Sequence, residues 1–384
     1  MHHDRNRRKF LMDSLGLAGT LVWASLPRAA RGADGTEAAA MIDRAVAFLR
    51  ARQDRDGVWS GDRKEPGITA LVVTALLRSR RLTPDDPAVI KGLSYLERFV
   101  GPKGGLSEAP HSVYSTSVAL MAYKEANRRG RYDALIKGSQ QFLKLTQIDE
   151  SEGKSRDDVS YGGLGYGGGN GRPDLSNTSF FVEALRESGL PADDPALKKA
   201  LLFVSRCQNF KSEFNDQPWA GKVNDGGFVY NPSGSEGAGR PRGGGGKGAG
   251  RTANTPLRSF AGMTYSGLKS MIYAGLTRDD PRVKAALGYI RTNYTVDENP
   301  GQGQRGLYYY YQTFAKALAL LGDRELVDSE GKPHDWRADL SAALAKRQGT
   351  SGSWVNPSDS FMEGDPNIVT SYALLALAAA GFGT

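Results

Sequence analysis

The chain has 384 residues, of which 39% are hydrophobic and 24% charged, so it can bury a large core in one or two domains. Its formal net charge of +8 comes mainly from two places: the first 32 residues hold six lysines and arginines against two acidic residues, and residues 233–251 hold four against one. The remainder is nearly neutral, which argues against nucleic-acid binding. A single cysteine, Cys207, excludes an internal disulfide.

Residues 1–33 have the features of a twin-arginine signal peptide. Arg7 and Arg8 precede an apolar run at 15–26 that is too short for an ordinary transmembrane helix, and small residues suited to cleavage follow. A basic flexible tail is the alternative. We therefore predict a bacterial protein exported to the periplasm or another extracytoplasmic place, which a retained leader would tether to the membrane. The mature chain has no further apolar stretch long enough to predict a transmembrane span.

A unit that joins an amphipathic stretch to a glutamine and a glycine-rich turn recurs along the chain. Glutamine occupies the same place in four of these units: Gln53, Gln147, Gln208 and Gln348. In the first and last units the sequence Gly-x-Trp follows, ending at Trp59 and Trp354. Apolar residues before the glutamines are spaced by four and then three, which predicts one apolar face per helix. We expect six such helices, the A helices.

A second, more apolar segment rich in small residues follows each unit. These segments lie near 67–80, 112–128, 176–189, 263–275, 308–321 and 367–381. A helix that is apolar nearly all round is buried, so we place these six B helices inside. Three Asp-Asp-Pro sequences connect B to A helices at 85–87, 193–195 and 279–281. Aspartate as N-cap and proline at the first helical position explain them as helix starts.

This alternation predicts an all-α fold, a single α/α toroid of six helical hairpins over residues 38–384. Its twelve helices form an inner and an outer ring. The long A-to-B loops must then gather on one face, where we expect function to lie. Residues 233–250 contain nine glycines and are expected to form a flexible insertion.

The Gln-x3-Gly-x-Trp units, the paired helices and the small-residue inner helices resemble the squalene-hopene cyclase and protein prenyltransferase superfamily. The resemblance covers residues 38–384, and weaker copies of the unit begin at Gly163, Gly226 and Gly306. It implies the toroidal fold. It also implies a structural role for the glutamines and tryptophans of the units, which in that superfamily tie neighbouring outer helices together.

The chain departs from the chemistry of that superfamily. It has no Asp-x-Asp-Asp motif, with which squalene-hopene cyclases protonate an alkene, and no Asp-Asp-x-x-Asp motif of class I terpene synthases. His111 and His334 are the only histidines beyond the leader, and no zinc constellation of the prenyltransferase kind is apparent. We therefore expect no metal and no cofactor. Because fold does not determine function, whether the chain is an enzyme stays open.

Two sets of residues on the loop face are candidates for a site. Four acidic residues have no ready explanation as helix caps and are candidates for general acid/base catalysis: Asp157, Asp158, Asp297 and Glu298. Five tyrosines are candidates for ligand contact: Tyr161, Tyr166, Tyr265, Tyr309 and Tyr372. Six B-helix N-termini should point to the same mouth and carry partial positive charge. These features suit a ligand with apolar or sugar rings and an anionic group.

Our leading hypothesis is that the protein binds or processes a ligand, a lipid or a glycan, in the central cavity and its mouth. One alternative is a divergent terpenoid cyclase or isomerase, with an acid donor from the 157–158 or 297–298 loop. A second alternative is an extracytoplasmic polysaccharide lyase or glycan-binding protein. A third is a structural interaction module with a filled core. Open space ringed by tyrosines would count against this third alternative.

Overall fold

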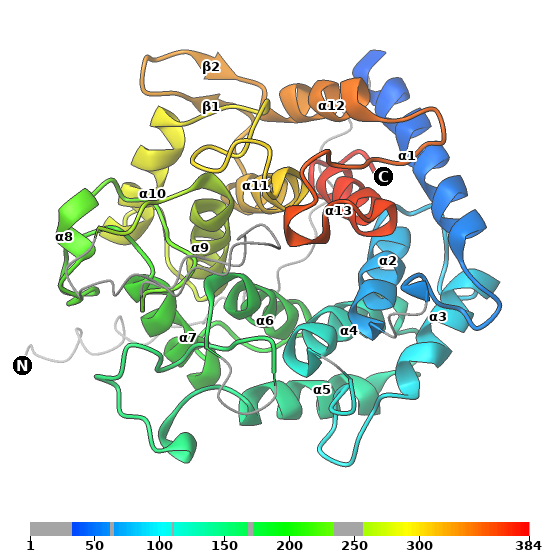
Figure 1. Ribbon diagram of the computed structural model, residues 1–384, viewed down its shortest axis with the longest axis horizontal. Coiled ribbons are helices and arrows are strands. Elements are labelled where there is room, and N and C mark those ends of the chain that lie inside the picture. Colours follow the sequence, from blue (N-terminus) through cyan, green and yellow to red (C-terminus); the bar gives the residue numbers. More distant parts are fainter. Residues whose placement is uncertain (1–32, 62–64, 110, 168–171, 234–255, 384) are drawn as a thin grey trace, which may run out of the picture.

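The computed structural model describes residues 33–61, 65–109, 111–167, 172–233 and 256–383. The expected signal peptide, up to residue 32, and nearly all of the glycine-rich insertion lie outside the described residues. Seen down its shortest axis, the described part of the molecule consists of two concentric rings of helices (Figure 1).

The two rings alternate along the chain. The outer ring is formed by α1 (Ala33–Arg52), α3 (Pro87–Glu97), α5 (Asp133–Leu145), α7 (Pro195–Arg206), α10 (Pro281–Thr292) and α12 (Trp336–Arg347). The inner ring is formed by α2 (Pro66–Arg78), α4 (Ser112–Ala126), α6 (Leu175–Glu187), α9 (Ala261–Tyr273), α11 (Leu307–Leu321) and α13 (Pro366–Ala379). The loops add the short helix α8 (Ala220–Val223), 3-10 turns at Glu150–Glu152 and Ser360–Met362, and an antiparallel hairpin of β1 (Leu326–Val327) and β2 (Pro333–His334).

Contacts between helices close the inner ring. Each inner helix packs on the next in chain order, and α13 returns to pack on α2. In the outer ring α12 lies beside α1, which packs on α13 (Figure 1). Residues of α2 from Pro66 to Leu77 are all buried, as expected of a helix that is apolar nearly all round. The predicted all-α toroid of six helical hairpins is therefore confirmed.

Asp-Asp-Pro sequences start three of the outer helices. Asp86, Asp194 and Asp280 are the N-caps of α3, α7 and α10, and each side chain accepts the backbone N–H two residues later at 2.9 Å. Proline occupies the first position of each helix, where its missing N–H costs nothing. The interpretation of the Asp-Asp-Pro sequences as helix starts is confirmed.

Glutamines at the ends of outer helices make two hydrogen bonds each. The Gln53 amide donates to the carbonyl of Gly57 in its own loop at 3.2 Å and to the carbonyl of Ala88 in α3 at 2.9 Å. Three further glutamines reach the next outer helix in the same way: Gln147 at Ala196, Gln208 at Arg282 and Gln348 at Met41. The bond from Gln348 joins the last unit to the first helix.

A glycine with positive φ lies beside each of these bonds. A Cβ on Gly57, whose φ is 88°, would come 2.7 Å from the carbonyl oxygen of Lys91 in α3. A Cβ added to Gly162, Gly226 or Gly352 would come even closer to a main-chain carbonyl oxygen of α7, α10 or α1, at 1.9, 2.2 and 2.5 Å. Both the left-handed backbone and the close approach require glycine. The third unit therefore uses Gly162, one residue before the Gly163 that its sequence suggested.

Trp59 and Trp354, the tryptophans of the first and last units, lie where the loops meet the inner ring. The Trp59 indole donates to the carbonyl of Leu49 in its own outer helix at 2.7 Å, and its backbone N–H donates to the Thr69 hydroxyl of α2 at 3.4 Å. Trp354 makes the equivalent bonds at 2.8 and 3.1 Å. Threonines of three other inner helices accept a loop N–H in the same way: Thr116, Thr178 and Thr264. These bonds seat the loops on the N-terminal ends of the inner helices.

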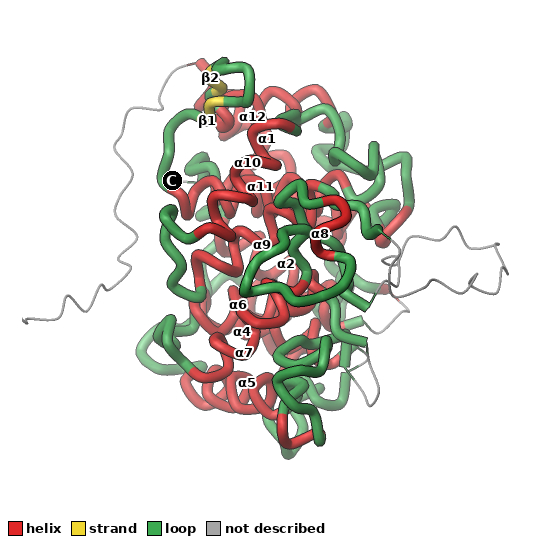
Figure 2. Tube along the Cα trace, turned by 90° about the vertical axis from the view of Figure 1, so that its left-hand side faces the viewer, coloured by secondary structure: helices red, strands yellow, loops and turns green. Residues whose placement is uncertain are grey.

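The longest loops gather on the face where the inner helices begin (Figure 2). The turns that lead back to the outer ring are mostly short, except that between α11 and α12, which contains the β1–β2 hairpin. Within the described residues, no helix combines the length and the apolar character needed to cross a membrane.

Candidate functional site

A cavity of about 1280 Å³ opens at the N-terminal ends of the inner helices. The third residue of five of these helices lines it: Ile68, Tyr114, Met263, Tyr309 and Ile368. In α6 the second residue, Ser176, takes this place. Phe180 and Tyr372, each four residues further along their helices, line the next layer down. The wall is therefore mainly apolar and aromatic.

Three exposed, largely apolar side chains stand among the residues that line this cavity. Tyr166, Phe361 and Met362 are 42%, 37% and 44% exposed. Phe361 and Met362 have φ values of 61° and 65°, a left-handed backbone that residues other than glycine rarely adopt. Strained backbone of this kind clusters at binding sites, where the surrounding structure holds it in place.

Three of the five candidate tyrosines line the cavity. Tyr309 and Tyr372 meet edge to face, with ring centroids 5.9 Å apart, and the Tyr309 hydroxyl lies 3.0 Å from the Ser266 hydroxyl. Tyr166 packs against the ring of His111 at 5.2 Å. Of the four consecutive tyrosines at the start of α11, only Tyr309 lines the cavity.

The other two candidate tyrosines lie elsewhere. Tyr265 comes two residues after Met263, so it points about 200° away around α9 and packs against Phe314 instead. Tyr161 belongs to a loop beside α7, where its hydroxyl donates to Glu150 at 2.6 Å. Neither side chain reaches the cavity wall.

None of the four candidate acids lines the cavity either. Asp158 accepts hydrogen bonds from Lys154 and Ser160, which lower its pKa to about 2, and Asp157 beside it is exposed. Such a low pKa leaves Asp158 without a proton to donate at neutral pH. Asp297 and Glu298 are exposed on the loop before α11. The loops that hold these acids lie on the predicted face and reach the cavity, but through other residues, Tyr166 and Asn299.

Asp174 is a buried carboxyl group directly behind the cavity wall. It is the N-cap of α6 and accepts the backbone and side-chain N–H groups of Asn177 at 2.8 and 2.7 Å. Burial raises its pKa to about 6, although hydrogen bonds from Asn177 and from the Tyr230 hydroxyl act in the opposite direction. Because Tyr230 lines the cavity, it connects this carboxyl group to the open space.

Glu363 is a second buried carboxyl group at the same end. It accepts the backbone N–H groups of Tyr309 at 2.8 Å and Tyr308 at 3.3 Å, at the start of α11, and the Asn356 amide at 2.6 Å. Burial raises its pKa to about 7. Glu363 thus fastens the segment that contains Phe361 to the helix that contains Tyr309.

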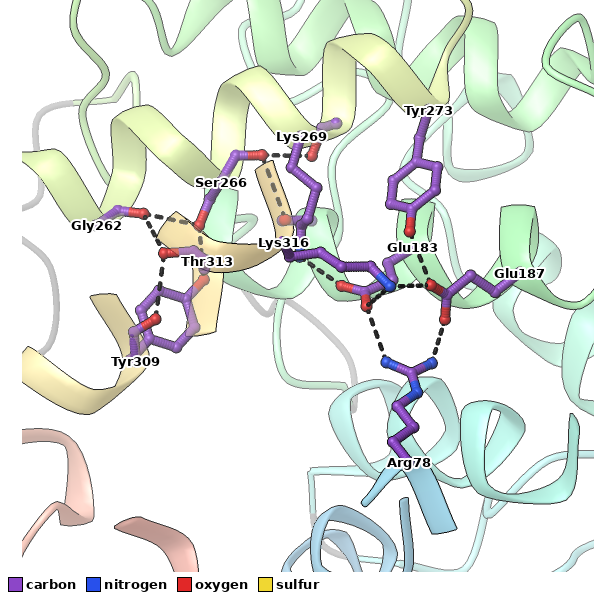
Figure 3. Close-up of polar contacts among 12 residues, drawn as sticks. Arg78, Glu183, Glu187, Gly262, Ser266, Lys269, Tyr273, Tyr309, Thr313 and Lys316 are labelled. Carbon is purple, nitrogen blue, oxygen red and sulfur yellow. Dashed lines mark hydrogen bonds and ion pairs between the residues drawn. The ribbon is translucent and has the colours of Figure 1, made fainter. Parts of the chain in front are cut away.

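The inner helices enclose a space that we call the bore. Charged side chains occupy the half of the bore that lies opposite the cavity. Three cations and three carboxylates from five inner helices meet there: Arg78, Lys269, Lys316, Glu125, Glu183 and Glu187. Figure 3 labels all of them except Glu125. The Lys269 ammonium lies 2.5 Å from Glu183, and both side chains are essentially unexposed. It also lies 5.5 Å from the centroid of the Phe180 ring, so the network begins just beneath the cavity wall.

Sequence reasoning missed several of the lining residues. Ile68, Tyr114 and Met263 share the third position of their helices, a signal that could have identified them once the helix starts were aligned. His111 was not among the candidate site residues. It is the N-cap residue of α4, lines the cavity and pairs with Glu65 at 3.1 Å. Among the described residues, no group of three or more His, Cys, Asp and Glu could hold a metal ion.

Comparisons with known proteins bear on the fold. No family model matches the sequence, and no curated protein is significantly similar to it. The solved type II terpene cyclase MstE from Scytonema, in complex with geranylgeranyl dihydroxybenzoate, is 13% identical with a TM-score of 0.55, over 91% of this chain and 99% of that one. Candida albicans protein geranylgeranyltransferase-I complexed with GGPP is 14% identical with a TM-score of 0.52, over 89% and 90%.

A glycosidase is 10% identical with a TM-score of 0.51, over 91% of this chain and 98% of that one. Identities this low show the fold alone, because one fold hosts many unrelated activities. The alignments nevertheless span nearly the whole of each chain. The protein therefore has a terpenoid cyclase/prenyltransferase-like α/α toroid fold.

Proposed function

We propose that this protein is exported from the cytoplasm and binds an isoprenoid-type hydrocarbon in the cavity at the mouth of the toroid. The cavity itself is the observation that carries the proposal. A volume of about 1280 Å³ accommodates a sizeable ligand, since ligand sites in proteins usually measure about 300–1,000 Å³. An interaction module with a filled core would not contain such a space.

The chemistry of the wall favours a hydrocarbon over a glycan. Ile68, Met263 and Ile368 present aliphatic groups, and Phe180 and Tyr309 present aromatic rings. Burying apolar ligand surface against such a wall is favourable by about 25 cal/mol per Å². Sugar hydroxyls would need matching polar partners there, since an unpaired buried hydroxyl is costly. Two of the structures with this fold were solved with geranylgeranyl compounds.

Ligand binding can be tested by blocking the cavity. Met263→Trp inserts bulk into the wall, and Leu145→Trp makes the same kind of change at a side chain that is 62% exposed on α5. We expect Met263→Trp to weaken binding of geranylgeraniol by about tenfold or more, and Leu145→Trp to leave it unchanged. Titration followed by native mass spectrometry measures both, with a cello-oligosaccharide as the glycan comparison. Equal affinities in both variants would contradict the proposed site.

A proton-transfer activity, such as isomerisation or cyclisation of the bound hydrocarbon, is a second candidate. The buried Asp174 favours it, because a carboxyl group with a pKa of about 6 is partly protonated near neutral pH and contacts Tyr230 of the wall. Asp174→Asn should then abolish turnover of a geranylgeranyl substrate while geranylgeraniol still binds. Unchanged turnover in Asp174→Asn would rule out this carboxyl group as the proton donor.

The proposal that the protein is exported rests on the arginine pair near the N-terminus. Replacing Arg7 and Arg8 with lysine keeps the charge but removes the pattern on which twin-arginine export depends. We expect the precursor of this double variant to accumulate in the cytoplasm, whereas the unaltered chain reaches the periplasm. Fractionation of cells and immunoblotting distinguish the two. Normal export of the double variant would contradict the assignment.

A further inference from the structure

The N-termini of the inner helices are satisfied from within the protein. Carboxylates cap three of them: Asp174 at α6, Glu363 at α11 and Asp365 at α13. Their oxygens accept helix N–H groups at 2.8 Å in each case. These N–H groups are the donors that would otherwise bind an anionic ligand.

Two of the other three helix starts have partners as well, and the third lacks its first N–H group. In α9 the N–H of Gly262 donates to Asn299 at 2.9 Å. In α4 the N–H of Val113 donates to the carbonyl of Tyr166 at 3.0 Å. Helix α2 begins with Pro66, which has no N–H. The anion-binding capacity expected of six helix ends is therefore largely used.

The charges at the mouth also balance. Each helix N-terminus is equivalent to roughly half a positive charge, so six of them amount to about +3. The three capping carboxyl groups offset most of that charge, with Glu363 partly protonated near neutral pH because its pKa is about 7. Among the described residues that line the cavity, Glu65 and Asp359 are acidic as well, while Arg52 and His111 are basic. The described residues that line the cavity therefore carry no surplus of positive charge for a ligand with several negative charges.

We infer that the cavity takes an isoprenoid with an uncharged headgroup, such as an alcohol, and discriminates against the corresponding diphosphate. This inference rests on the proposed hydrocarbon-binding function and assigns the class of headgroup. A hydroxyl group can share hydrogen bonds with the tyrosine hydroxyls of the wall, such as Tyr114, Tyr309 and Tyr372, which neither need nor supply a full charge. A diphosphate would have to lie near the capping carboxylates, and like charges in a partly dry site repel strongly.

The test compares two ligands that share one hydrocarbon chain. Geranylgeraniol and geranylgeranyl diphosphate are titrated against the full mature protein in the same buffer. We expect the alcohol to bind about tenfold more tightly or better. Equal or tighter binding of the diphosphate overturns the inference while leaving hydrocarbon binding intact. Binding of neither ligand overturns the proposed function and the inference together.

A charge-reversal pair locates the discrimination at the mouth. Asp359→Lys places a cation on an exposed residue that lines the cavity, and Glu97→Lys makes the same change in net charge on the outer helix α3. We expect Asp359→Lys to raise affinity for the diphosphate about tenfold with little effect on the alcohol. Glu97→Lys should change neither affinity. Similar gains in both variants would show that net charge, not the cavity, sets the preference, and would overturn the inference.

Discussion

The two ends of the bore hold buried carboxylates in opposite electrostatic surroundings. At the mouth, Asp174 and Glu363 are bound by amides and a hydroxyl, and burial raises the pKa of both. At the ion-paired end, formed by Arg78, Lys269, Lys316 and their carboxylate partners, the cations hold the pKa of Glu183 and Glu187 below its ordinary value despite burial. Cations compensate the buried carboxylates only at the ion-paired end, whereas amides, a hydroxyl and helix N-termini do so at the mouth. This difference supports the proposal that the ion-paired end serves the fold and the mouth serves a ligand.

The largest expected effect lies at the ion-paired end. Glu183→Gln leaves Lys269 buried beside a neutral amide, and breaking a buried ion pair in this way costs about 3–5 kcal/mol. The free energy of unfolding, from urea titration, measures it. Glu125→Gln is the matched control, because that side chain is 25% exposed and should cost only about 1 kcal/mol. Equal losses in the two variants would mean that burial does not distinguish them.

The second effect concerns pH and separates the two ends. Between about pH 7 and 5, folded Asp174 and Glu363 bind protons that the unfolded chain does not yet bind, so acidification stabilises the fold. We expect a gain of about 3–4 kcal/mol between pH 7.5 and 5, from pKa values raised by about two units or slightly more. At lower pH the sign reverses. Protonation of the unfolded chain begins near the ordinary pKa of Glu183 and Glu187, and their lowered folded pKa makes the stabilisation fade below about pH 4.5.

The gain between pH 7.5 and 5 should vanish when the two mouth carboxyl groups no longer titrate. The double variant Asp174→Asn, Glu363→Gln keeps the shape of both side chains and removes their charge. The unfolding free energy of this variant should hardly change between pH 7.5 and 5. A gain that persists in this variant would show that other groups are responsible for it.

A smaller effect is expected in the outer ring, which belongs to neither end. Gln208 is buried, and its amide donates to Gly226 at 3.0 Å and Arg282 at 2.9 Å. Gln208→Ala removes two buried hydrogen bonds, so we expect a loss of about 2 kcal/mol in unfolding free energy. Gln217→Ala, at a partly exposed loop residue whose amide donates to the adjacent Asp216, should cost less than about 0.5 kcal/mol. Similar losses of unfolding free energy in the two variants would contradict a structural role of Gln208.

The smallest effect is expected at the rim of the mouth. The His111 side chain is 52% exposed where it meets Glu65, and exposed pairs contribute about 0–1 kcal/mol. His111→Asn removes the pair while suiting the left-handed backbone, whose φ is 50°. Thermal unfolding should hardly change. A large drop in stability would mean that the mouth contributes to the fold as the ion-paired end does.

The helices and their order could be predicted because they depend on local patterns. Apolar spacing located all six inner helices to within two residues of their ends, and Asp-Asp-Pro gave three helix starts. These signals lie within a few residues of one another, so no tertiary contact has to be known.

The candidate site was harder to predict because its parts meet only in the closed ring. Glu363 caps an N–H group 54 residues earlier in the chain, which no local pattern indicates. Asp158 was selected because its loop lies on the expected face. Its side chain, however, pairs with Lys154 of the same loop and does not line the cavity. The ion-paired end likewise depends on side chains from five helices, each of which contributes only one or two of the six charged residues.

The most direct test is photo-crosslinking of the full mature protein with a diazirine analogue of geranylgeraniol, followed by mapping of the labelled peptides. We expect saturable labelling of the peptides that contain Phe180, Met263 and Tyr309, and competition by unlabelled geranylgeraniol. The Met263→Trp variant should lose this labelling. Labelling confined to the outer helices, or labelling that unlabelled geranylgeraniol cannot compete, would contradict a hydrocarbon site at the mouth of the bore.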